Sequence, residues 1–140
     1  MYSGIFSAPK LQFPGIVKPA ALADLAQYPG LLVSGDQLTG KVVVYGTKYC
    51  IGQIVVTKVF SQEKIEVGDI LQVVVRSGKV HFLVTLHDAA RNYFRYFETV
   101  PQRRVGLVSL EKLSDYKPLV KRGSNTYFAF VLHHHVPSPL

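Results

Sequence analysis

Runs of β-branched and aromatic residues, separated by Gly, Pro and polar residues, make up much of this chain after residue 40 and predict β-strands. The clearest run begins at residue 79, where apolar and other side chains alternate and so predict a strand with one buried face. Four apolar side chains would share that face: Val80, Phe82, Val84 and Leu86. Just before it, Ser77 and Gly78 separate two β-branched runs, which is typical of a two-residue hairpin turn.

Other β-branched or apolar runs, bounded by Gly, Pro and polar residues, predict further strands. They span residues 41–45, 53–60, 69–76, 93–100, 105–110 and 126–132. Residues 88–92 are expected to form a loop or a single helical turn. The strand 126–132 is apolar on both faces, so we expect it at the centre of the core or at a contact with another subunit. Residues 19–28, which begin with Pro and are rich in Ala and Leu, favour the one short helix, and Pro29-Gly30 ends it.

One short pattern occurs twice: an aliphatic residue, a glycine and a polar residue, followed by a run rich in aliphatic residues. Its glycines are Gly52 and Gly68. We predict that both occupy equivalent strand-entry positions, since glycine permits a tight turn before a strand. The fold class expected from these elements is mainly β: a small antiparallel β-barrel or sandwich with SH3/Tudor-like elements and one short N-terminal helix. Residues 1–18 are expected to form an extended, apolar, Pro-rich arm, and residues 19–140 a single β-rich domain.

Composition adds a strong positive charge to this picture. The chain has 140 residues, of which 48% are hydrophobic and 18% charged, so it is globular rather than disordered. Its net charge is +7, and much of the excess falls between residues 91 and 122. Such a surface attracts anionic partners, although solubilising surface charge is the competing interpretation. The candidate nucleic-acid-binding residues are Arg91, Arg95, Arg103, Arg104, Lys121 and Arg122.

An aromatic cluster lies within this basic stretch. Aromatic side chains interleaved with arginine can stack on bases while the arginine contacts phosphate. Core packing of the same rings is the alternative, because alternation along a strand turns one set inward. Aromatic residues of a barrel can also cage a methylated lysine, but a protein of charge +7 repels cationic peptides unless acidic groups lie beside the rings. The candidate aromatic patch consists of Tyr93, Phe94, Tyr96 and Phe97.

The residues offer little for catalysis or metal binding. The lone Cys50 has no histidine near it in sequence and is expected to be a small buried residue. Residues 133–135 are three histidines, but only the outer two of a strand could share a metal ion, so we expect surface or structural roles. Glu63, Glu66 and Asp69 are interpreted as solvated turn residues. We therefore expect no catalytic residues, no metal and no cofactor.

Four phrases between residues 46 and 136 carry a resemblance to a known family: residues 49–53, 65–70, 79–82 and 115–119, followed by a closing apolar strand. On these phrases the region resembles the C-terminal domain of uncharacterised, often transposon-associated, animal proteins. The resemblance implies a non-catalytic accessory domain.

The function expected is that of a non-enzymatic intracellular interaction module with a basic face that binds DNA or RNA, with a nuclear location as one option. The alternative is a protein–protein or self-association domain that forms homo-oligomers through the N-terminal arm and the last strand. No apolar run is long enough to predict a membrane span, so no membrane partner is expected.

Overall fold

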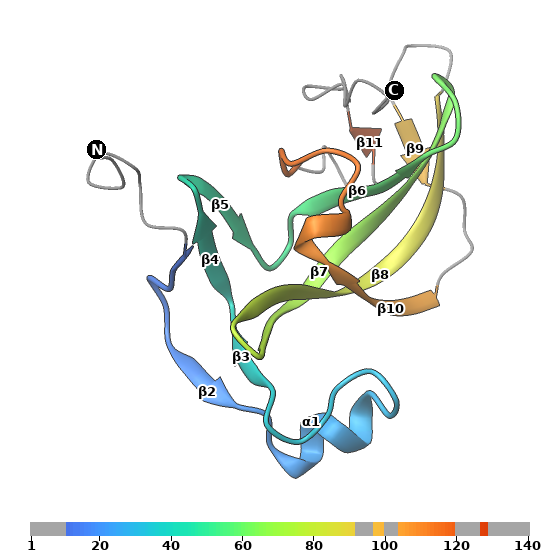
Figure 1. Ribbon diagram of the computed structural model, residues 1–140. Coiled ribbons are helices and arrows are strands. Elements are labelled where there is room, and N and C mark those ends of the chain that lie inside the picture. The colour runs from blue at the N-terminus through green and yellow to red at the C-terminus, as the bar shows by residue number, and fades with distance from the viewer. Residues whose placement is uncertain (1–10, 92–96, 100–103, 120–126, 129–140) are drawn as a thin grey trace, which may run out of the picture.

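The computed structural model describes residues 11–91, 97–99, 104–119 and 127–128, and in them the chain is mainly β, as predicted (Figure 1). The elements are β1 (Leu11–Gln12), β2 (Val17–Pro19), α1 (Leu22–Gln27), β3 (Gln37–Thr39), β4 (Lys41–Val44), β5 (Thr47–Cys50), β6 (Ile54–Val59), β7 (Lys64–Arg76), β8 (Lys79–Arg91), β9 (Phe97–Thr99), β10 (Arg104–Ser109), the 3-10 helix η2 (Leu110–Lys112) and β11 (Tyr127–Phe128).

These strands form two antiparallel sheets. The smaller one has the order β1-β4-β5. The larger one runs β11-β9-β8-β7-β3-β2, with β10 added beside β8 and β6 beside β7. The described strands do not close into a barrel. β1 and β2 bring residues of the expected arm into the sheets, since they pair with β4 and β3 respectively.

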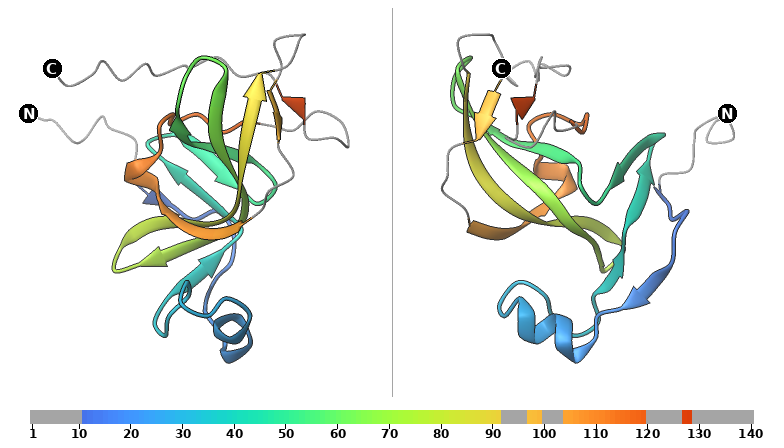
Figure 2. Two further views of the ribbon diagram at one scale, coloured as in Figure 1. Left: turned by 90° about the vertical axis from the view of Figure 1, so that its right-hand side faces the viewer. Right: turned by 180° about the vertical axis from the view of Figure 1, so that it is seen from behind.

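A long hairpin of β7 and β8 is the backbone of the larger sheet. Its turn is the predicted pair, Ser77 at φ 52° and Gly78 at φ 75°, a conformation that matches the twist of the flanking strands. Different strands flank its two halves: β6 and β9 at one end, β3 and β10 at the other. The hairpin curves through the molecule, with α1 toward one end and β9 and β11 at the other (Figure 2).

Two expectations about local structure need correction. The loop expected at residues 88–92 is wrong for its first four positions, because β8 continues to Arg91, paired with β7 as far as Ala90 and with β9 at Arg91. Pairing along the whole ladder, with Ala89 fully buried, overrides the weak strand propensity of this segment. The helix is present, but it begins at Leu22, after β1 and β2, so it is not the first element of the chain.

Gly52 and Gly68 are not equivalent, contrary to the prediction. Gly52 has φ 94° and lies in the turn before β6, where a left-handed backbone is needed. Gly68 lies inside β7 with an extended backbone. A Cβ atom built there would lie 2.8 Å from the Cβ of Val84 on β8, so the reason for this glycine is a close approach between two strands.

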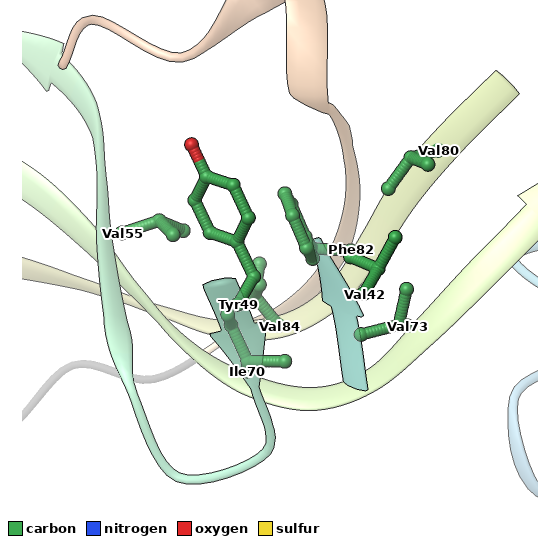
Figure 3. Packing of buried hydrophobic residues seen from close by; sticks show 8 residues of the cluster. All are labelled: Val42, Tyr49, Val55, Ile70, Val73, Val80, Phe82 and Val84. Atoms are coloured by element: carbon green, nitrogen blue, oxygen red, sulfur yellow. The ribbon is translucent and has the colours of Figure 1, made fainter. Parts of the chain in front are cut away.

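The core consists of three clusters of buried side chains. The first joins the two sheets and comprises Val42, Tyr49, Val55, Ile70, Val73, Val80, Phe82 and Val84 (Figure 3). The rings of Tyr49 and Phe82 lie 5.1 Å apart between centroids. As predicted, Val80, Phe82 and Val84 share one face of β8. The expectation that only this face is buried is wrong, because Leu83 and His87 on the other face are buried as well. The second cluster lies around Ile54, Val56 and Val67, and the third joins Leu83 to the α1 region.

Residues 110–119, here called the strap, run along the outer edge of β6 (Figures 1 and 2). Leu110 and Leu113 pack on the first cluster, whereas Leu119 belongs to the second. The Leu119 N–H donates to the Ile54 carbonyl at 2.7 Å, and the Ile54 N–H donates back at 2.8 Å. The strap therefore links two clusters and occupies a strand edge that would otherwise be open.

Candidate nucleic-acid interface

Buried acidic side chains set the charge of the surface. Asp36 is almost fully buried, and its carboxylate accepts two hydrogen bonds of 2.8 Å from Arg76. The hydrogen bond from Arg76 lowers the pKa of Asp36 below its usual value. Arg76 also donates to the Leu31 carbonyl at 2.9 Å, so this ion pair fixes the loop after α1 to the end of β7.

Glu66 and Asp69 are also turned inward, which makes the prediction of solvated turn residues wrong for both. Glu66 is buried within β7, where its carboxylate accepts hydrogen bonds from Thr57, at 2.6 Å, and from Arg104. Asp69 is paired at 3.0 Å with buried His87. Glu63 lies exposed in the turn before β7, as expected.

The exposed charges that remain are mostly positive. Among the acids whose burial is described, Glu63 and Glu111 are exposed, whereas Asp24, Asp69 and Asp88 are partly buried. The exposed cations are Lys18, Lys41, Lys48, Lys58, Lys64, Lys79, Arg91, Arg104, Lys112 and Lys117. Internal pairing of the acids therefore leaves the described surface with a strong positive bias, which raises the local concentration of anionic partners.

Two of the predicted basic residues are described. Arg91 is exposed at the end of β8, and its N–H donates to the Glu63 carbonyl at 2.8 Å. Arg104 begins β10 opposite Leu86, five positions before Arg91 on β8, which separates their backbones by about 17 Å. The Arg104 side chain is 53% exposed, but its guanidinium is held by Glu66. Arg104 therefore has a structural role, because it pairs with the buried carboxylate of Glu66.

The other predicted residues are not placed by the structure. Phe97 lies on β9 opposite Arg91, and only its backbone is described. Arg95, Arg103, Lys121, Arg122, Tyr93, Phe94 and Tyr96 lie outside the described residues. The basic and aromatic patches predicted from the sequence therefore stay predictions.

A different aromatic and basic group lies at the turn between β6 and β7. We call Lys58, Phe60, Lys64 and Arg91 the β6–β7 tip. Phe60 is 55% exposed, and the Lys64 ammonium lies 5.8 Å from the centroid of its ring, within the range of a cation–π contact.

The turn that carries this group is fixed by backbone hydrogen bonds. The N–H groups of Phe60 and Ser61 both donate to the Lys64 carbonyl, at 2.9 and 3.0 Å. The Ser61 hydroxyl oxygen accepts from the Glu63 N–H at 3.2 Å, as serine often does in turns. Phe60 and Lys64 are thereby held side by side at the end of the hairpin.

Strand alternation decides which side chains share a face. Lys58 pairs with Glu66, so Lys58, Phe60 and Lys64 lie on one face of the tip. Arg91 follows Ala90, which pairs with Lys64, and so belongs to the opposite face. An exposed ring between two lysines can stack on a nucleobase while the ammonium groups contact the adjoining phosphates.

Sequence reasoning missed this group because Phe60 was interpreted only as the end of a strand. The available signal was a short polar turn, residues 61–63, with Lys58 before it and Lys64 after it. An aromatic residue beside a hairpin turn has no partner strand beyond it, so exposure was the physical expectation there.

A reactive cysteine and a metal site have no supporting geometry in the described part of the chain. Cys50 is half-buried, and its N–H donates to the Gln53 side chain at 2.8 Å. No cluster of three or more His, Cys, Asp or Glu side chains that could hold a metal ion occurs among the described residues, and the histidines at 133–135 lie outside them. Within the same residues, no helix has the length and apolar character needed to cross a membrane.

No protein-family model, no curated protein and no solved structure matches this chain.

Proposed function

We propose that this protein is a non-enzymatic interaction module that binds single-stranded nucleic acid, DNA or RNA, at the β6–β7 tip. The observation that carries this proposal is the exposed ring of Phe60, flanked by Lys58 and Lys64 on a surface whose acids are largely turned inward. The predicted basic stretch after residue 91 begins next to this tip, because Arg91 is hydrogen-bonded to the turn through Glu63.

A single strand suits this geometry better than a duplex. The face of Phe60 can stack only on a base that is not already stacked between its neighbours, and such a contact is worth about 1–3 kcal/mol. Lysines beside the ring neutralise phosphates and release counterions, which makes binding dependent on salt. Neither contact reads base identity, so the proposed binding tolerates many sequences.

Binding of a fluorescently labelled single strand, measured by anisotropy over a range of salt concentrations, tests the proposal. Replacing both Lys58 and Lys64 by Ala should reduce the log–log salt slope by roughly 1.4, since each phosphate contact on a single strand contributes about 0.7. Phe60→Leu should weaken binding at every salt concentration without changing the slope. The matched control replaces Lys112 and Lys117 by Ala, which removes the same charge from another part of the surface.

Two outcomes would overturn the proposal. One is the absence of detectable affinity for single-stranded DNA or RNA at low salt. The other is an equal loss in the control and in the Lys58/Lys64 variant, which would mean that only overall charge matters. Tighter binding to a duplex than to a single strand would contradict the stacking role of Phe60.

Self-association is the second candidate, and the outer edge of β10 favours it. β10 pairs with β8 on one side and with no described strand on the other, and Val105 on it is exposed. Residues 105–109 carry no charge and no proline, the usual means of blocking an edge. Light scattering of the wild type and of Val105→Lys tests this candidate, since a charge at the edge should convert a dimer to a monomer. A wild type that is monomeric at high concentration removes it.

The SH3/Tudor-like character, the intracellular or nuclear location and the resemblance to transposon-associated proteins belong to the same proposal. They agree with a non-catalytic accessory domain that meets nucleic acid. A tagged chain that is excluded from the nucleus would restrict the nucleic-acid partner to cytoplasmic RNA.

A further inference from the structure

A groove separates the β4–β5 hairpin from the strap, on a part of the surface away from the β6–β7 tip. Its volume is about 570 Å³, and a second hollow of about 250 Å³ continues it toward the β7–β8 turn. The two share a wall formed by Val44, Tyr45, Leu110 and Glu111. A volume of this size is within the range of small-ligand and peptide side-chain sites.

Three tyrosines line this groove. Tyr45 stands at the tip of the β4–β5 hairpin and is 62% exposed, while Tyr116 on the strap is 51% exposed. Tyr49 lies deeper and is only 2% exposed, with its hydroxyl directed away from the rest of the first cluster (Figure 3). That hydroxyl donates a hydrogen bond to the Tyr116 carbonyl, which ties the buried ring to the strap.

Tyr45 occupies a position that the fold alone does not favour for tyrosine. It has φ 48° and precedes Gly46 at φ 82°, so the two form a hairpin turn with both residues left-handed. Asn-Gly is the preferred pair in such turns, because a bulky side chain is strained there. Strain of this kind is concentrated at functional sites, and here it places an exposed aromatic ring at the rim of a groove.

The charge of this groove is opposite to that of the surface around it. Glu111 is the charged residue that lines the main groove, and the buried Asp115 of the strap is near enough to Tyr49 to add to the rise in its pKa that burial causes. Lys79 lines the second hollow. Aromatic faces and carboxylates both attract cations, so the main groove complements a positively charged group and repels phosphate.

We propose that this tyrosine groove binds the methylated ammonium group of a lysine side chain in a peptide. A trimethylammonium group carries its charge on a large, weakly hydrated surface and has no N–H to satisfy. The groove fits those properties, because it is lined by two exposed tyrosines, Tyr45 and Tyr116, and by one exposed carboxylate, while the Tyr49 hydroxyl is already engaged with Tyr116. An unmodified ammonium group would lose more hydration on entering the same site.

A calorimetric titration with three versions of one short, otherwise neutral peptide tests this inference. The versions carry trimethyllysine, unmodified lysine, or the uncharged tert-butyl isostere of trimethyllysine. We expect the trimethyllysine peptide to bind roughly 2- to 30-fold more tightly than the uncharged isostere, which is the range of a cation–π contact. It should also bind more tightly than the unmodified lysine peptide, whose ammonium group loses more hydration. Equal binding of the isostere would overturn the proposal in favour of an apolar peptide site.

The decisive variant is Tyr45→Asn. Asparagine suits the left-handed turn, so this variant should melt at or above the wild-type temperature while losing affinity for the trimethyllysine peptide. Glu111→Gln should weaken binding of the cation and leave the isostere unaffected. Unchanged affinity in Tyr45→Asn would overturn the proposal.

Phe60→Leu is the matched control, because it also removes an exposed aromatic ring, but at the β6–β7 tip. It should leave the peptide affinity unchanged. The effect of salt also distinguishes the two sites. Salt should weaken nucleic-acid binding steeply, because it opposes the release of counterions from phosphates. Peptide affinity should stay equal or rise, because salt screens the repulsion between the cationic peptide and a protein of net charge +7. Peptide affinity that falls steeply with salt, or falls in Phe60→Leu, would place the peptide elsewhere and contradict the inference.

Discussion

Replacing Gly68 by Ala tests the closest approach between strands in the core. The added Cβ would lie 2.8 Å from the Cβ of Val84 and 2.9 and 3.1 Å from its two methyl carbons. Val84 is fully buried and β-branched, so it cannot rotate out of the way. The two strands must separate locally, and overpacking of this kind costs about 1–3 kcal/mol of the free energy of unfolding.

Urea denaturation followed by circular dichroism measures this loss. At about 3–4 °C per kcal/mol for a domain of this size, the melting temperature should fall by roughly 3–12 °C. Gly40→Ala is the control, because its Cβ would meet only Ile51 at an ordinary 3.6 Å and its backbone is not left-handed. That variant should be neutral or slightly more stable, since alanine reduces the entropy of the unfolded chain. A Gly68→Ala protein within about 0.5 kcal/mol of the wild type would refute the role assigned to this glycine, since surface changes are of that size.

Three further predictions concern polar groups in the core. Asp36→Asn should be less stable than the wild type at pH 7, because the ionised Asp36 carboxylate, whose pKa is lowered, stabilises the fold through Arg76. The difference in stability should narrow as pH falls below about 4, where the carboxylate becomes protonated. A constant difference across acid denaturation curves would contradict this. Burial raises the pKa of Tyr49 to about 12, so its contribution to stability should be fully present below pH 10 and decline between pH 10 and 12. Tyr49→Phe should lose about 1 kcal/mol of stability at neutral pH and show a smaller alkaline decline. An equal alkaline decline in both proteins would assign that decline to another group. Arg104→Met should cost roughly 1–3 kcal/mol in urea denaturation, because it leaves the buried Glu66 carboxylate without its cation; an unaffected Cm would show that Arg104 is free for ligand contacts.

The parts of the fold that depend on neighbouring residues could be predicted from the sequence. Alternation along β8 identified the face that packs into the first cluster, although it missed the burial of Leu83 on the other face. Ser77-Gly78 identified the central hairpin, because turn geometry is set by the turn residues themselves. The turn at Tyr45 escaped prediction, since tyrosine is a poor residue for a left-handed position.

Features that depend on distant segments could not be predicted. Glu66 was interpreted as a solvated acid because its partner Arg104 lies 38 positions away and reaches it only after β10 pairs with β8. The tyrosine groove has the same origin, since Tyr45 and Tyr116 lie on separate segments that meet only in the folded chain. Charge pairing and site assembly thus followed from sheet register, which short-range patterns do not encode.

The strap also has a consequence for the order in which this protein folds. Its bond from the Ser114 hydroxyl to the Thr57 carbonyl spans 57 positions, and closing so large a loop costs more entropy than forming the β7–β8 hairpin, whose partners are neighbours in the chain. The strap should therefore dock late. Until it does, β6 presents an unpaired edge of Ile54, Val55 and Val56, which is a template for pairing with another chain. The period of greatest aggregation risk for this protein is thus the interval between hairpin formation and strap docking, and it should lengthen in any variant that weakens the contact of Leu119 with β6.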